Sequence, residues 1–299
     1  MEGTIFIGID VSQQSNSVHV MDQSGNKLWQ RSFENSLLGS QEFVQQLLET
    51  KRNRTVSFFS FGLEATGCYG DQIAMFLRET DQIPRSEKEV RLLNPKQVSR
   101  FKKSYSELPK TDSIDAFVIA DSLRFGRIGL KGTVVDEKYL ALQKLTRSRF
   151  QVAKDLSREK NRYLQTLFLK FSTMAQDSPL SNNFGTTAIE LVNEFESVDE
   201  IAYTPLEELA AFLNQKGKSH FVDPQALAAE IQKAARSSYR LPKAIQDSVN
   251  QVLGMQAQTI HFYAKQLKDY DKLIKAQMTG IPNTLTSIKG IGPVYAAGI

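Results

Sequence analysis

Two apolar, β-rich runs that each lead into an acidic residue constrain the fold of this chain most strongly. Thr4 to Asp10 is a short run rich in isoleucine, and Thr55 to Leu63 is a second such run that stops just before Glu64. Runs of this length and composition are typical of buried strands. A carboxylate at the end of a buried strand is costly unless a partner or a metal ion compensates its charge. We therefore expect Asp10 and Glu64 to share a site.

The segments between and after these runs predict the order of strands and helices. They show clear periodicity and turn signals, which predict strands at 17–22, 27–33 and 89–93 and helices at 37–48 and 71–79. Gln23-Ser24-Gly25-Asn26 is a turn signal between the first two of these strands and indicates a hairpin. Three strands with a hairpin, followed by alternating helix and strand, is the order of a ribonuclease-H-like α/β fold.

Two more acids, Asp112 and Asp115, open a helix expected over 112–123. Their spacing of three residues puts both carboxylates on one face of that helix. Acids in a first helical turn also cap the helix and complement its dipole, so this alternative stays open for the pair. Carboxylates are the oxygen ligands that Mg²⁺ and Mn²⁺ prefer. Two such ions about 4 Å apart clamp the oxygens of a phosphodiester displacement. The four acids together predict a metal-dependent nuclease centre.

Composition excludes several other classes of site. The chain has 299 residues, long enough for two domains, and a formal net charge of +4. Its single cysteine, Cys68, excludes an internal disulfide and a cysteine-based zinc site. The three histidines show no ligand spacing. We find no signal peptide and no apolar run long enough to cross a bilayer, so we expect a cytoplasmic protein without a membrane partner.

Basic residues gather in two segments, which favours a nucleic-acid partner. Residues 96–110 hold five Lys/Arg against one acid, and residues 138–170 hold nine against two. Such segments bind phosphate backbones through counterion release, although a solvated helix face has the same composition. The candidate contacts are Lys96, Arg100, Lys102, Lys103, Lys110, Arg147, Arg149, Lys154, Arg158, Lys160 and Arg162.

The rest of the chain reads as helical. Residues 138–171 and 241–278 have long helical periodicity, which predicts an antiparallel pair or coiled coil. Shorter helices are expected between them, with breaks at Pro205 and Pro224. The tail, 285–299, is typical of a helix-hairpin-helix element.

In that tail, Gly290 and Gly292 leave backbone N–H groups free for a phosphate, although a tight turn without a ligand fits the same residues. We expect three parts, 1–130, 131–279 and 280–299. Because the tail stops early in the second helix of its motif, we also expect the chain to be C-terminally truncated.

Several short motifs occur in the order found in a known family. They are Gly8-Ile9-Asp10-Val11-Ser12, Glu64-Ala65-Thr66-Gly67, Asn94-Pro95 with Arg100-Phe101, Lys110-Thr111-Asp112-Ser113-Ile114-Asp115-Ala116, and Gly290-Ile291-Gly292-Pro293. In these motifs the chain resembles the DEDD transposases of the insertion sequence 110 family, which includes the pilin-gene invertase and the bridge-RNA-guided recombinases. The box around Asp112 and Asp115 is the most specific of them.

The resemblance implies a RuvC-type nuclease fold in which Asp10, Glu64, Asp112 and Asp115 take the family's metal-binding positions. It also implies a coiled coil, a second domain whose serine attacks DNA, homo-oligomers that assemble as dimers and tetramers, and a structured guide RNA that pairs with donor and target DNA. Ser287 does not match the position of that serine. Two alternatives remain open: a stand-alone Holliday-junction resolvase or ribonuclease-H-like nuclease, and a non-catalytic nucleic-acid-binding protein.

Overall fold

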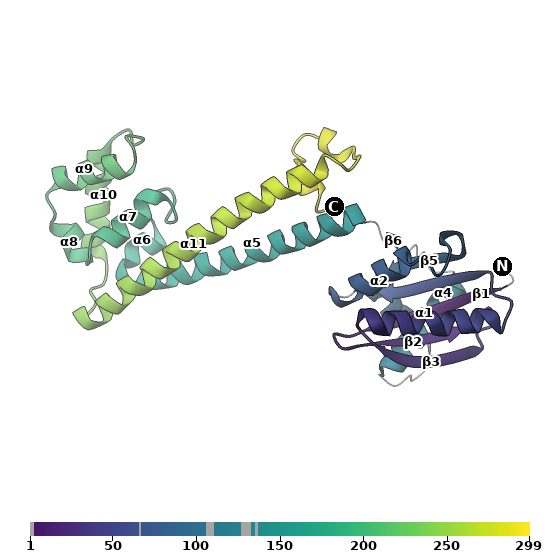
Figure 1. The fold of residues 1–299 in the computed structure, drawn as a ribbon. Helices are drawn as coiled ribbons and strands as arrows, with labels where there is room; N and C mark the ends of the chain where they lie inside the picture. Colours follow the sequence, from purple (N-terminus) through teal and green to yellow (C-terminus); the bar gives the residue numbers. More distant parts are fainter. Residues whose placement is uncertain (1–2, 66, 106–110, 127–132, 135–136) are drawn as a thin grey trace. The chain divides into compact units, whose positions relative to one another are not determined.

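The computed structural model describes residues 3–65, 67–105, 111–126, 133–134 and 137–299. The chain forms two compact units, Met1–Leu140 and Ala141–Ile299. The first is built around a β-sheet and the second from helices (Figure 1). The expected boundary between residues 130 and 131 lies outside the described residues.

Six strands form one sheet in the first unit: β1 (Thr4–Val11), β2 (Ser15–Met21), β3 (Lys27–Glu34), β4 (Phe58–Glu64), β5 (Lys88–Leu93) and β6 (Thr133–Val134). Their spatial order is β3-β2-β1-β4-β5-β6. β2 is antiparallel to β1 and β3, whereas β4 is parallel to β1 and β5. The predicted hairpin closes as expected, because the Asp22 carboxylate accepts the backbone N–H groups of Ser24 and Asn26, each at 2.9 Å. The predicted ribonuclease-H-like fold is confirmed.

One face of the sheet is continuous and apolar. Ile7, Ile9 and Phe61 are fully buried there and belong to one core with side chains of α1 (Leu37–Arg52) and α2 (Tyr69–Glu79). Successive residues of a strand alternate between the two faces, so the intervening positions of β1 and β4 face the other way. The apolar face therefore supplies most of the burial that stabilises this unit.

The opposite face carries glycines where the first face carries isoleucine and phenylalanine. A Cβ atom added at Gly8 would lie less than 3.0 Å from the backbone of α4 (Asp112–Phe125), at Ala116 and Ala120. At Gly62 an added Cβ would meet the side chain of Leu123, also in α4. The missing side chains let α4 lie directly on β1 and β4.

Two more helical elements complete the first unit. A 3-10 turn, η1 (Arg85–Glu87), leads into β5, and α3 (Pro95–Lys102) follows that strand. Asn94 caps α3, because its side-chain oxygen accepts the N–H of Lys96 at 2.9 Å, and proline occupies the first turn. Val98 of α3 packs in a small core with α4, so the two helices are held together.

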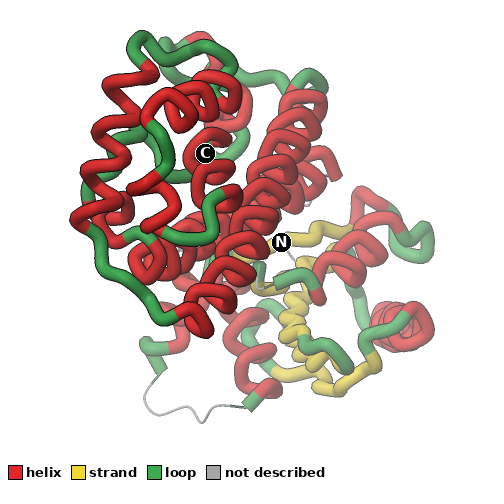
Figure 2. Tube along the Cα trace, turned by 90° about the vertical axis from the view of Figure 1, so that its left-hand side faces the viewer, coloured by secondary structure: helices red, strands yellow, loops and turns green. Residues whose placement is uncertain are grey.

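The second unit is organised by two long helices, α5 (Glu137–Lys170) and α11 (Lys243–Met278), which run side by side (Figures 1 and 2). Leu142, near the start of α5, shares a core with Ile274, near the end of α11, so the pair is antiparallel as predicted. The Arg149 guanidinium also donates to the Asp271 carboxylate across the pair at 2.6 Å. Within the described part of the chain, no helix is both long and apolar enough to cross a membrane.

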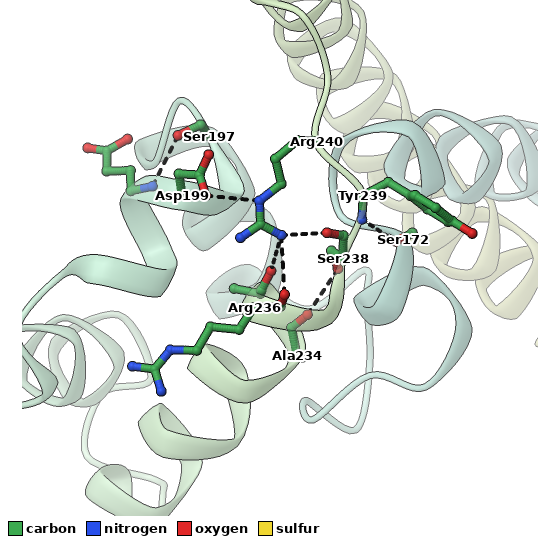
Figure 3. Close-up of polar contacts among 10 residues, drawn as sticks. Ser172, Ser197, Asp199, Ala234, Arg236, Ser238, Tyr239 and Arg240 are labelled. Carbon is green, nitrogen blue, oxygen red and sulfur yellow. Dashed lines mark hydrogen bonds and ion pairs between the residues drawn. The ribbon is translucent and has the colours of Figure 1, made fainter.

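Five shorter helices connect the end of α5 to the start of α11: α6 (Ser172–Gln176), α7 (Thr186–Glu194), α8 (Val198–Tyr203), α9 (Leu206–Lys216) and α10 (Pro224–Ser237). The predicted breaks are confirmed, because α9 begins after Pro205 and α10 begins at Pro224. The turn from α10 into α11 is fixed by the Arg240 guanidinium. It pairs with Asp199 at 2.9 Å and donates to the carbonyl of Ala235 (Figure 3).

The tail packs on the end of the long pair. It contains a 3-10 turn, η2 (Leu285–Ser287), and a short helix, α12 (Pro293–Ala296). Ala296 is buried in the same core as Leu142 and Ile274. Where the sequence predicts two helices around a hairpin, the structure therefore has a three-residue 3-10 turn before Gly290 and a four-residue helix after Gly292. Some apolar residues of the tail, among them Ile291, Val294 and Ala296, pack in the core that α5 and α11 share.

Candidate metal centre

The register between β1 and β4 brings the first two acids together. Gly8 pairs with Gly62 and Ile9 with Leu63 in this parallel ladder. The next positions along the two strands are Asp10 and Glu64, which therefore end neighbouring strands at the same edge of the sheet. Each acid is two residues beyond a glycine, so both carboxylates belong to the glycine-bearing face that α4 covers. The predicted shared location of Asp10 and Glu64 follows from this geometry.

Helix α4 brings the other two acids to the same edge. Gly8 contacts the helix at Ala116, the residue that directly follows Asp115. Asp112 and Asp115 lie in the first turn of α4, Asp112 exposed and Asp115 half-buried. The start of the helix is tied to the sheet by the Gln30 side chain, which donates to the carbonyl of Ser113 at 2.9 Å.

Electrostatic effects link the four acids. Burial, reinforced by the negative charges of Asp115 and Asp112, raises the pKa of Asp10 to about 6. Burial, reinforced by the charges of Asp10 and Asp115, raises the pKa of Glu64 to about 6. The pKa values of Asp10 and Glu64 thus respond to the charges of the acids on α4. The charges of Asp112 and Asp115 therefore act on strand residues as well as on the start of their own helix.

A lysine already lies among these acids. The Lys102 ammonium, at the end of α3, is 2.5 Å from the Asp115 carboxylate, and its charge also acts on Asp10 and Glu64 to oppose the rise in their pKa. Across the described residues, no group of three or more Asp, Glu, His or Cys side chains is arranged to hold a metal ion. The acids thus interact electrostatically with one another, and Asp115 is also ion-paired with Lys102.

The donor set nevertheless fits a hard divalent cation. All four side chains offer carboxylate oxygens, the chemistry that Mg²⁺ and Mn²⁺ prefer. Asp10 and Glu64 are half-buried and mutually repulsive, so a divalent charge between them would relieve the repulsion. Gly8 and Gly62 let α4 lie in close contact with β1 and β4, so all four acids are carried by strands and a helix that pack directly on one another.

A buried polar network behind the centre was not expected from the sequence. The Tyr105 hydroxyl donates to the Asp121 carboxylate, which also binds the Arg124 guanidinium at 2.6 Å. Burial, together with the hydrogen bond to Asp121, raises the pKa of Tyr105. Asp121 is 5 % exposed, so this network clamps the end of the α3 segment to α4. The available signal was an acid inside the apolar helical run Ala116–Ser122.

The predicted nucleic-acid contacts fall into distinct environments. Lys96, Arg100 and Lys103 are exposed on or just after α3, whereas Lys102 points to the acids. Lys110 lies outside the described residues.

On α5, Arg147 is exposed, while other predicted contacts there are engaged within the second unit. These are Arg149 with Asp271, Arg158 with Asp155, Arg162 with Glu159, Lys154 over the ring of Phe150, and Lys160 over the ring of Phe184. Arg149, Arg158 and Arg162 are therefore paired with carboxylates, whereas the aromatic rings leave the charges of Lys154 and Lys160 in place. Gly290 and Gly292 lie in the turn that precedes α12.

Comparisons with known proteins identify one similar solved structure and one matching family. The structure of T. thermophilus RuvC in complex with a Holliday junction substrate is similar over 42 % of this chain and 97 % of that one, at 13 % identity and a TM-score of 0.31. The comparison with curated proteins found no match. A model of the DEDD transposases of the insertion sequence 110 type, described as a transposase, matches residues 7–171, which is more than half of the chain. The chain belongs to the DEDD transposase family of insertion sequence 110.

Proposed function

We propose that the first unit is the metal-dependent nuclease centre of a DNA transposase or site-specific recombinase. One observation carries this proposal: Asp10 and Glu64 lie at the ends of paired strands beneath the acidic first turn of α4, and the charges of Asp115 and of neighbouring acids raise the pKa of both. A structural cluster would be expected to pair these charges internally, whereas in the described residues Lys102 alone pairs with Asp115 and acts on Asp10 and Glu64.

The four carboxylates would together hold Mg²⁺ or Mn²⁺. When bound, such ions stabilise the charge that develops on phosphodiester oxygens and lower the pKa of a bound hydroxyl or water. Asp10 and Glu64 contribute from rigid strand ends, and Asp115 from the helix that Gly8 places against β1. The half-buried position of these side chains strengthens their field at the phosphate.

We assign to the first unit the metal-binding part of strand exchange. The resemblance places the serine nucleophile in a second domain, and Ser287 does not match its position. The protein's DNA partner follows from its membership of a transposase family. A structured guide RNA and assembly into dimers and tetramers are parts of the same proposal, supported by the exposed cations of α3 and by Arg147 of α5.

Binding of Mn²⁺ to the purified chain tests the centre directly. We expect Asp10→Asn to weaken Mn²⁺ binding, measured by calorimetry, by about tenfold or more, because it removes one oxygen ligand from a set of four. Asp81→Asn is the matched control, since Asp81 is an exposed acid of the same unit. Unchanged Mn²⁺ affinity in the Asp10 variant would contradict the proposed centre and favour the non-catalytic alternative.

DNA cleavage separates the remaining alternatives. In the proposed recombinase, strand cleavage in Mg²⁺ joins the DNA to a serine, so we expect a covalent protein–DNA product. Cleavage of a Holliday junction that is abolished by Asp10→Asn but leaves no covalent product would instead favour a resolvase that uses water as its nucleophile.

A further inference from the structure

The only cation paired directly with the acid centre in the described residues is Lys102. Its Nζ lies 2.5 Å from Asp115 Oδ1, and the two side chains are 24 % and 29 % exposed. The same ammonium acts electrostatically on Asp10 and Glu64. The Lys102 ammonium therefore lies within the electrostatic field of three acids, where a divalent cation would bind.

The position of Lys102 is built into the fold. Asn94 and Pro95 fix the start of α3, and Val98 and Phe101 pack it against α4. Just beyond Lys102, Tyr105 is bound to the buried Asp121 of α4. These contacts hold both ends of α3 on the helix that carries Asp115. The neighbouring Lys103, by contrast, is exposed and has no ion pair within the described residues.

An ion pair at a solvent-exposed site contributes little to stability, but this one is partly enclosed and serves several acids. Without a cation, half-buried carboxylates at one strand edge repel one another. A lysine offers a single positive charge on a flexible stem, so it compensates the acids only in part and leaves when a divalent ion arrives. A ligand that binds the same carboxylate competes with the metal.

We propose that Lys102 is the resident counter-ion of the acid centre, holding Asp115 in the metal-free chain and competing with the divalent cation for it. This inference rests on the proposed function and adds a regulator to it: metal loading requires the Lys102 ammonium to leave Asp115. The α3 helix, which positions the lysine, then becomes the element that sets how readily the centre takes up its metal.

Substitutions at residues 102 and 103 test this role with the purified chain. We expect Lys102→Met to bind Mn²⁺ about tenfold more tightly by calorimetry, since the competitor is gone. In EDTA the same variant should melt about 2–4 °C lower, since Asp115 loses its ion-pair partner. Lys102→Arg keeps the charge and should stay near the wild type in both measurements. Lys103→Met is the control and should change neither.

The outcomes separate this inference from the proposed function. If Lys102→Met leaves Mn²⁺ affinity unchanged or lowers it while Asp10→Asn weakens binding, the metal centre stands and the counter-ion role is wrong. If Asp10→Asn has no effect either, the proposed centre itself is wrong. Should Lys102→Met fail to melt cooperatively, Lys102→Gln is measured in its place and must show the same tighter binding.

Discussion

The two faces of strands β1 and β4 have different roles: one stabilises the fold, and the other carries the candidate metal centre. One face presents Ile7, Ile9 and Phe61 to a closed apolar core, and the other presents Gly8 and Gly62 to a helix backbone. On the second face the residues that follow are charged and repel one another. Successive residues of a strand point to opposite faces of the sheet, so each residue of the apolar face is next to a residue of the metal-centre face. A substitution on one face should therefore change folding alone, and a substitution on the other should change the metal centre as well.

The largest expected effect belongs to the apolar face. Phe61→Ala should lower the free energy of unfolding by about 3–5 kcal/mol, because it leaves a cavity at a fully buried position. Denaturant unfolding measures this change. Mn²⁺ affinity of the folded fraction should stay at the wild-type value. A large loss of metal affinity in protein that is still folded would show that the two faces are not independent.

Gly8→Ala should produce both changes at once. Its Cβ would collide with the backbone of α4 at Ala116 and Ala120, so the helix must shift. We expect a loss of about 2–3 kcal/mol in stability together with weaker Mn²⁺ binding. The matched control is Gly254→Ala in α11, where an added Cβ meets no atom within 4 Å. Normal Mn²⁺ binding by the Gly8 variant would mean that α4 does not need its close approach to position Asp115.

The Tyr105 network offers a smaller effect. Tyr105→Phe removes one hydrogen bond to the buried Asp121 carboxylate but leaves the Arg124 ion pair. We expect a loss of about 1–2 kcal/mol in the free energy of unfolding, measured with denaturant. Tyr139→Phe, at an exposed position of α5, serves as the control. Equal stability of the two variants would remove Tyr105 from the contacts that hold α3 on α4.

The pH dependence of the metal-free chain should give the smallest change. The folded-state pKa values of Asp10 and Glu64 are raised to about 6, from 3.8 and 4.5. Between these limits the folded chain binds more protons than the unfolded chain, so the contribution of the two acids to stability decreases as pH rises. Their repulsion develops as pH rises through about 6 and is complete only well above that value.

Thermal melts in EDTA and in Mg²⁺ test the direction of this pH dependence. The stabilisation by Mg²⁺ should grow from about pH 4 to pH 7, because protons no longer compete for the carboxylates. The double variant Asp10→Asn/Glu64→Gln should lose most of this dependence, whereas Asp81→Asn/Glu42→Gln, at exposed positions, should retain it. A Mg²⁺ effect that is largest at the acid end would contradict the raised pKa values.

Sequence patterns predicted the elements of this fold better than the contacts between them. The apolar run before Asp10, the hairpin turn and the prolines at 205 and 224 are local signals, and each led to the observed element. The pairing of Gly8 with Gly62 depends on strand register, and the ion pair of Lys102 with Asp115 depends on how two helices pack. Both are long-range contacts that a single sequence does not specify.

The tail and α5 show a related limit. The Gly-Ile-Gly turn at 290–292 predicts a pair of helices, but the apolar residues beside it pack on α5 and α11 instead. The cations of α5 look like one basic surface in sequence, yet several of them are paired with neighbours along the helix or across the pair. Charge counts take no account of such pairing.

The length of the two long helices has a consequence for the size of any ligand that contacts both ends of the second unit. At 34 and 36 residues, α5 and α11 each extend for about 50 Å. The short helices α6 to α10 lie at one end of the pair and the tail at the other (Figure 1). A small molecule cannot bridge that distance. A nucleic acid that did so along a straight path would need about 15 base pairs of duplex.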